Sequence, residues 1–221
     1  MRSRMLVCFF LGVLLGDACL GEGSPVVGVV TMSVGGHAGS AVLSAGSTIF
    51  QGEYLSTEMT GRFQLQTWAA RLYVDGGSAV TVQGAADALS IELRRGTVVV
   101  SCAKASAIKV TALNAEIRPA GDAPTVAQVS IAGSKALHIF VRRGKLKFSY
   151  GGESEVIAEG SSITVVLDPL GEQGPKGAGA SWPGIGQGHH RRFLILLWVG
   201  GSAAAASWFA VREALESPDR P

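Results

Sequence analysis

The chain has 221 residues and a formal net charge of +2, with 30 glycines and only 7% aromatic residues. Between residues 24 and 168, 12 lysines and arginines face 11 aspartates and glutamates without a basic block, which argues against a nucleic-acid-binding protein. The three cysteines are too few for a disulfide framework or a thiolate metal site, and Cys102, at the end of an apolar run, is interpreted as a small buried hydrophobe.

The N-terminal segment has the three regions of a secretory signal peptide. Met1–Arg4 carries two arginines, Met5–Gly16 is a short apolar run, and small residues follow. We expect a signal peptide over residues 1–18, with cleavage as late as residue 23, and therefore export of the chain. Lipidation of Cys19 stays open as an alternative for the mature N-terminus.

The central region, 24–168, predicts an all-β domain. Runs of strand length recur every 8–12 residues or so, are rich in Val, Ile and Thr, and are separated by glycine-containing turns. The expected strands are Val26–Met32, Ala41–Leu43, Phe63–Thr67, Ala79–Val82, Ser90–Leu93, Thr97–Ser101, Ala107–Ala112, Val126–Ile131, Leu137–Val141, Lys145–Tyr150, Glu155–Ala158 and Ile163–Leu167.

One phrase occurs twice in this domain. Leu93–Ser101 reads LRRGTVVVS and Val141–Ser149, 48 residues later, reads VRRGKLKFS, which predicts two equivalent strands, each preceded by a glycine turn. Consecutive apolar residues predict burial on both faces of the first strand. Alternation in the second places Lys145, Lys147 and Ser149 on a polar face.

The repeated arginines are the candidate ligand residues. Arg94, Arg95, Arg142 and Arg143 could form one basic patch for an anionic envelope polymer. The alternative is that these arginines are solvated or paired with nearby glutamates, which are Glu92, Glu153 and Glu155.

Several segments, in this order, resemble the FecR-like periplasmic domain family. They are Ala45–Thr57 (AGSTIFQGEYLST), Gly61–Leu65 (GRFQL), Gly77–Val82, the two RRG strands and Val156–Val165 (VIAEGSSITV). The resemblance covers about 140 residues, essentially the whole central region. It implies a bacterial, periplasmic fold: an elongated all-β stack of hairpins, either solenoid-like or sandwich-like.

The C-terminal region predicts a tether. Residues 169–192 are rich in glycine and proline and predict a flexible linker. Phe193–Val211 is free of charges over 19 residues, roughly 28 Å as a helix, and predicts one transmembrane helix before a short tail, 212–221. Its small residues, such as Gly200 and Ala204, would let two such helices pack in a homo-oligomer. A cytoplasmic, tail-anchored domain is the alternative topology, since His189–Arg192 would then obey the positive-inside rule.

No pattern in the sequence indicates catalysis. The central region lacks a nucleophile elbow, a zinc-protease motif, a P-loop and a dinucleotide-binding motif, so we expect no catalytic, cofactor or metal site. A hydrolase would have to use His37, placed in a glycine-rich turn, or His138, placed on the polar face of a strand.

Two functional hypotheses follow. The first is a non-catalytic, membrane-tethered envelope module that binds a protein or polymer ligand and takes part in transmembrane signalling, with partners adding a strand to exposed sheet edges. The second is a structural envelope protein that self-associates.

Overall fold

The protein is described by a computed structural model over residues 24–68, 70–85, 88–104, 108–167 and 193–197. Every helix or strand in these ranges is a β-strand, which confirms the predicted all-β class. None of the described segments is a helix long and apolar enough to cross a bilayer. The predicted signal peptide, the linker, the tail and most of the predicted membrane helix lie outside the described residues.

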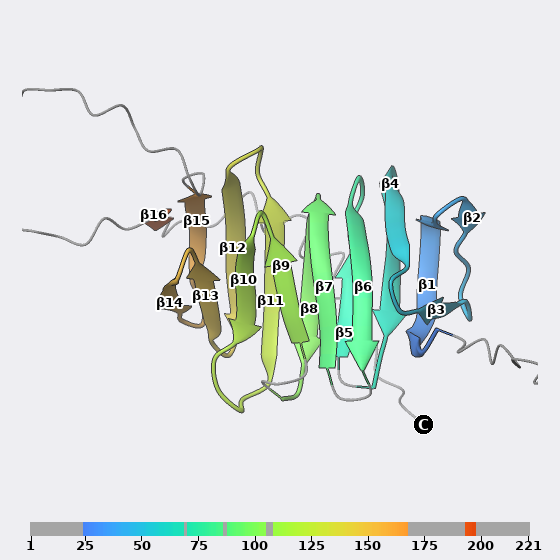
Figure 1. Cartoon of the computed structure of the whole chain (residues 1–221), viewed down its shortest axis with the longest axis horizontal. Coiled ribbons are helices and arrows are strands. Elements are labelled where there is room, and N and C mark those ends of the chain that lie inside the picture. The colour runs from blue at the N-terminus through green and yellow to red at the C-terminus, as the bar shows by residue number, and fades with distance from the viewer. Residues whose placement is uncertain (1–23, 69, 86–87, 105–107, 168–192, 198–221) are drawn as a thin grey trace, which may run out of the picture.

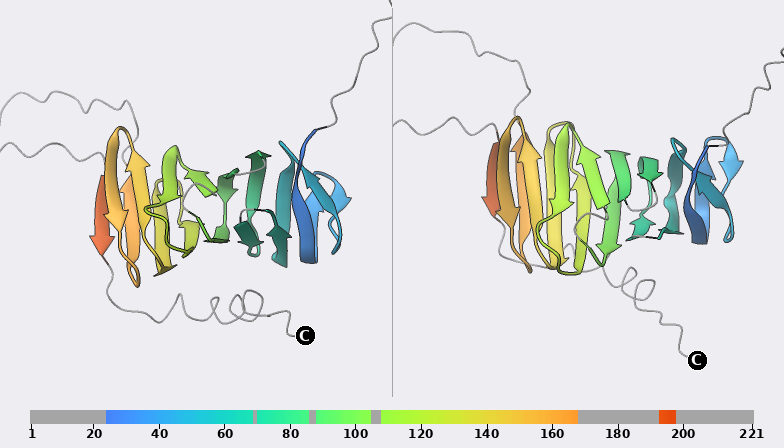
Figure 2. Two further views of the ribbon diagram at one scale, coloured as in Figure 1. Left: turned by 90° about the horizontal axis from the view of Figure 1, so that it is seen from below. Right: turned by 60° about the horizontal axis from the view of Figure 1, so that its bottom comes forward.

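The strands form one 16-stranded sheet that folds back on itself into two facing arms (Figures 1 and 2). The first, called here the β6 arm, contains in spatial order β6 (Ala79–Ala85), β7 (Ala88–Arg95), β9 (Ile108–Ala112), β10 (Ala115–Pro119), β13 (Leu146–Tyr150) and β14 (Glu153–Ile157). The second, the β5 arm, contains β5 (Ala70–Val74), β8 (Thr97–Cys102), β11 (Thr125–Ile131), β12 (Ala136–Arg143), β15 (Ser162–Leu167) and β16 (Phe193–Leu197).

Two long bent strands join the arms at one end. The strands at this end are β1 (Val26–Ala38), β2 (Ala41–Val42), β3 (Thr48–Phe50) and β4 (Tyr54–Gln66). The first residues of β4 pair with β6, its last four pair with β5, and β1 follows it along both halves. At the bend the two backbones nearly touch, because a Cβ on Gly61 would lie 2.6 Å from the carbonyl oxygen of Gly35.

The structure places His37 differently from the sequence prediction. The sequence predicts a glycine-rich turn around it, but His37 lies within β1, where it pairs with Val42 of β2 and Ser56 of β4. The glycines do not end the strand. They let it curve over the end of the core instead, with Gly35 at a φ of +57°.

The core fills the space between the arms. After β6 and β7 the chain passes to the β5 arm for β8, then alternates, with β9 and β10 in the β6 arm, β11 and β12 in the β5 arm, and β13 and β14 in the β6 arm again. One continuous cluster of buried apolar side chains draws on both arms and on the joining strands; Phe63, Ile91, Ile139 and Phe148 are all fully buried in it. Neither arm can therefore bury its inner face without the other.

Both RRG glycines lie where the chain crosses between arms. Gly96 leads from β7 to β8, and Gly144 leads from β12 to β13. Each has a φ of +81°, a backbone conformation that L residues rarely adopt. A Cβ on Gly96 would lie 2.3 Å from Ser78 Oγ, and one on Gly144 would lie 2.6 Å from Thr125 Oγ1. The predicted equivalence of the two phrases therefore has a structural basis, which is a close crossing over the end of the core.

The strands after these glycines have the predicted faces. Val98, Val99 and Val100 are all buried, so β8 is covered on both faces. In β13, Leu146, Phe148 and Tyr150 are buried while Lys147 is exposed. Cys102 is buried in the core, as its interpretation as a small hydrophobe requires.

The last described segment differs from the sequence expectation. Phe193–Leu197, the start of the predicted membrane helix, forms β16 and pairs antiparallel with β15. Residues 198–211 lie outside the described residues. A five-residue apolar run fits a strand as well as a helix, and the edge of β15 offers partners for its backbone groups.

The crossing glycines generate the first prediction. Replacing Gly96 by Ala adds both a disfavoured φ and a steric clash, so we expect it to lower the free energy of unfolding by about 3 kcal/mol or more. Gly133→Ala is the matched control, because Gly133 also has a positive φ (+87°) but has nothing within 4 Å of an added Cβ. That variant should lose only about 1–2 kcal/mol in urea unfolding. Equal losses would show that the close approach to Ser78 is unimportant.

Candidate ligand-binding surface

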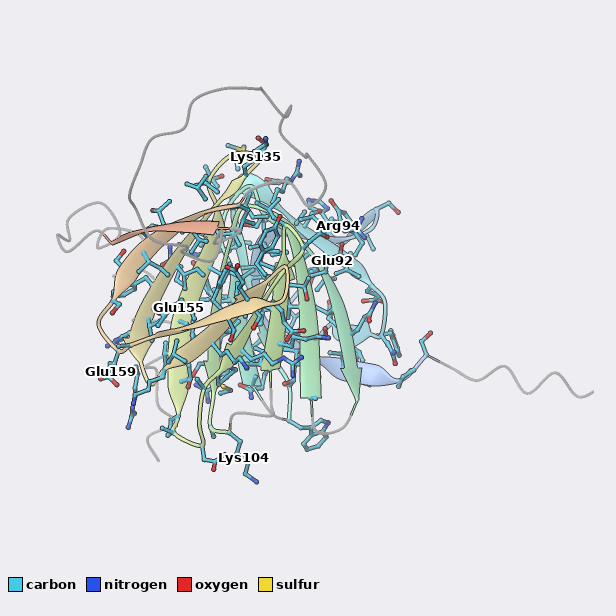
Figure 3. The ribbon with its side chains drawn as sticks, turned by 60° about the vertical axis from the view of Figure 1, so that its left-hand side comes forward. Glu92, Arg94, Lys104, Lys135, Glu155 and Glu159 are labelled. Atoms are coloured by element: carbon cyan, nitrogen blue, oxygen red, sulfur yellow. The ribbon has the colours of Figure 1, made fainter. Side chains whose placement is uncertain are left out.

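The four RRG arginines do not form one patch. Arg94 and Arg95 end β7 in the β6 arm, whereas Arg142 and Arg143 end β12 in the β5 arm. The two crossings also lie at opposite ends of the strands. Figure 3 shows Arg94 near one end of the molecule and Glu159, whose carboxylate accepts a hydrogen bond from the Gly144 N–H at 2.9 Å, near the other. No single small ligand can therefore contact both pairs.

Arg94 has a local structural role. Its guanidinium donates to Glu92 Oε2 at 3.4 Å and lies 5.7 Å from the centre of the Tyr54 ring. Both side chains of the ion pair are more than half exposed, so water screens their attraction. For Arg94, the predicted pairing with Glu92 is confirmed.

A different group of cations lies side by side on the outer face of the β6 arm. Arg118 of β10 and Lys147 of β13 are direct cross-strand partners. Lys109 of β9 lies on the other side of Arg118, because the adjacent pair in the register is Val110 with Ile117. Lys109 is in turn paired with Ser90 of β7, and Ser90 with Gln83 of β6. We call these five residues the outer row; at a strand spacing of about 4.8 Å it is roughly 19 Å long.

The outer row borders a hollow of about 680 Å³. Its polar lining comes from four members of the outer row together with Gln51, which precedes β4. Its apolar lining includes Leu89, Ile108 and Pro119, which are largely buried, and Ala88, which is exposed. The hollow thus combines two cations, two amides and a hydroxyl with one exposed apolar side chain, that of Ala88, because Leu89 and Ile108 belong to the core.

The charges of the outer row are only partly compensated. Arg118 forms an ion pair with Glu116, two residues before it on the same strand. Among the described residues, neither Lys109 nor Lys147 has an ion-pair partner. Like charges directly opposite in a sheet destabilise it, so the neighbouring Arg118 and Lys147 have an electrostatic cost.

The groups with shifted pKa values lie apart from one another. Burial raises the pKa of Cys102 and, with a contribution from the nearby Asp75 carboxylate, that of Tyr73; burial lowers the pKa of His138. Cys102 points into the core, and Tyr73 on β5 is three strands, about 14 Å, from His138 on β12. Within the described ranges, no three His, Cys, Asp or Glu side chains are grouped to hold a metal ion.

His138 predicts a pH dependence of stability. Its ring lies on the outer face of β12, with Nε2 3.0 Å from Ser162 Oγ. Because burial lowers its pKa in the folded protein, the unfolded chain takes up this proton first as the pH falls below about 6.5. The free energy of unfolding should therefore fall as the pH drops from about 7 toward 5, and His138→Gln should remove part of that slope. An unchanged slope in the variant would show that His138 is not its source.

Because the two arginine pairs are far apart, we predict that substitutions in them act independently on stability. We expect Arg94→Gln and Arg142→Gln to change the free energy of unfolding additively, within about 0.5 kcal/mol, because the two residues lie in different arms and at opposite ends of the strands. Urea unfolding of both single variants and the double variant measures this. A coupling above about 1 kcal/mol would mean that the two crossings interact.

Comparisons with known proteins give little further information. No protein-family model matches the chain, and no curated protein matches it. Two crystal structures of a candidate anti-sigma factor from Parabacteroides distasonis are similar to part of it, each with a TM-score of 0.43 and 13% sequence identity. The similarity covers 51% of this chain and 54% of that one, so the chain spans about half the length of the solved protein.

Proposed function

We propose that the chain is a non-catalytic module of the bacterial cell envelope, tethered to a membrane, that binds a protein or polymer ligand and takes part in transmembrane signalling. The observation that carries the proposal is the outer face of the β6 arm. It presents a hollow and a row of cations on a scaffold whose inner face is committed to the core. Membership of the FecR-like periplasmic family is part of the proposal. It is supported by the ordered motifs and by the equivalent crossings at Gly96 and Gly144.

The ligand is recognised by a face of the sheet in this proposal, not by its β14 edge. β14 ends the β6 arm, and its residues Glu153 and Glu155 pair with Tyr150 and Phe148, whose side chains lie on the core side. Carboxylates on the inner side of an edge strand are a common device against pairing with further strands. The same carboxylates oppose self-association through the β14 edge.

The localisation is tested by a reporter enzyme, active only outside the cytoplasm, fused after Pro169. We expect an active fusion, because residues 1–18 have the pattern of an export signal. Fusion of the same reporter to a chain lacking residues 1–23 is the matched control and should be inactive. Activity only in a cytoplasmic reporter would contradict the envelope proposal and favour the tail-anchored alternative.

A binding function is tested by crosslinking in intact cells, followed by extraction of the membrane and purification of the full chain. A heterologous envelope protein or polymer that copurifies in proportion to the chain supports the proposal. Recovery of homo-oligomers alone would instead support the structural alternative.

A further inference from the structure

We propose that the outer face of the β6 arm binds an acidic oligosaccharide, with Lys109, Arg118 and Lys147 holding its carboxylates and the adjoining hollow holding its sugar rings. The inference rests on the proposed function, that the chain binds an envelope ligand. It adds the chemical class of that ligand and the residues that contact it.

The positive charge of the outer row is only partly compensated by the fold. Three cations occupy consecutive strands of one sheet face, and Arg118 and Lys147 are direct cross-strand partners. Such a juxtaposition costs stability in the free protein. A carboxylate between two of these cations would remove the repulsion and gain charge-assisted hydrogen bonds.

The outer face of the β6 arm carries carboxylates as well as cations. The next row of the same face contains Glu92 and Glu116, as shown by their register with Thr81 and Ser149. These carboxylates lie close to any ligand on the outer row and would repel a polymer with a dense, continuous negative charge. A ligand with separated charges, one carboxylate on some of its units, fits this mixed surface better than a polyphosphate or a nucleic acid.

The direction of the outer row favours a saccharide over a peptide. A peptide that extends a sheet runs parallel to an edge strand and uses its backbone hydrogen bonds. The outer row instead crosses the strands, and its register pairs Gln83 with Ser90, Ser90 with Lys109, and Arg118 with Lys147, so most backbone groups along it are engaged within the sheet. A ligand there is recognised mainly by side chains. Gln51, Gln83 and Ser90 supply amides and a hydroxyl, which donate to and accept from sugar hydroxyls.

The lining of the hollow matches the same class. The exposed Ala88 can contact the C–H groups of a sugar ring, while Gln51, Gln83 and Ser90 contact the hydroxyls. The cations continue beyond the hollow to Lys147 on β13, so the ligand would extend across the strands from the hollow toward β14. Carboxylates spaced by about one or two strand separations, about 5 or 10 Å, would meet successive cations.

Calorimetric titration of the purified full chain with a panel of uronic-acid tetramers tests the proposal. We expect at least one acidic tetramer to bind, a neutral glucose tetramer to bind far more weakly, and the affinity to fall as salt is raised. The double variant Lys109→Gln, Lys147→Gln should weaken binding at least tenfold. Lys135→Gln, at the exposed β11–β12 hairpin of the other arm (Figure 3), is the matched control and should bind like the parent.

A tetraglutamate peptide distinguishes saccharide recognition from general anion attraction. We expect it to bind more weakly than the uronic-acid tetramer, and Gln83→Ala to reduce that difference. Equal binding of peptide and saccharide, full affinity in the double lysine variant, or no binding by any acidic tetramer would each overturn the proposal.

Stability separates a binding role for the lysines from a structural one. Since the double variant removes a like-charge contact, its melting temperature should equal or exceed that of the parent while its affinity falls. A lower melting temperature together with weaker binding would show that the lysines support the fold and overturn their assignment as ligand contacts. If the saccharides fail while the chain is exported and copurifies with another envelope ligand, only the ligand class is wrong. If the chain is not exported, the proposed function itself fails.

Discussion

The structure depends on a core that two arms of one sheet must share. A β-sheet with one apolar face has to bury that face, and among the described residues each arm is covered by the other arm and by the joining strands. The chain therefore crosses repeatedly over the ends of the core. At Gly96 and Gly144 the crossing is so close that an added Cβ would overlap Ser78 or Thr125. A side chain at either crossing would have to displace the neighbouring segment of the chain.

The burial of both inner faces determines which surfaces can bind a ligand. With the inner faces buried, recognition falls to the outer faces and the strand edges. At β14 the edge has Glu153 and Glu155 on its core side, which opposes the addition of another strand. The outer face of the β6 arm, in contrast, keeps neighbouring cations that the fold alone would disfavour. The stability that this surface costs the free protein supports its role in ligand binding.

The sequence predicted which faces of several strands are buried, but it did not predict which strands lie side by side. Alternation in Leu146–Tyr150 and the consecutive valines 98–100 predicted the buried faces correctly, because those patterns are local. The RRG arginines looked like one site because they share a phrase, yet the chain places the two copies in different arms and at opposite ends. Lys109, Arg118 and Lys147 were not recognised together, since only the strand order β9–β10–β13, with its jump across β11 and β12, brings them side by side. The one local signal was Lys147 on the predicted polar face of its strand.

The shared core is tested most directly by hydrogen exchange of the native protein, followed at increasing denaturant concentration. If the two arms form one cooperative unit, the slowest amides of β7 and β13 in one arm and of β8 and β12 in the other should open with the same free energy, equal to that of global unfolding. Amides of the β6 arm that open at a distinctly lower free energy than those of the β5 arm would contradict this account, because the arms would then be stable independently.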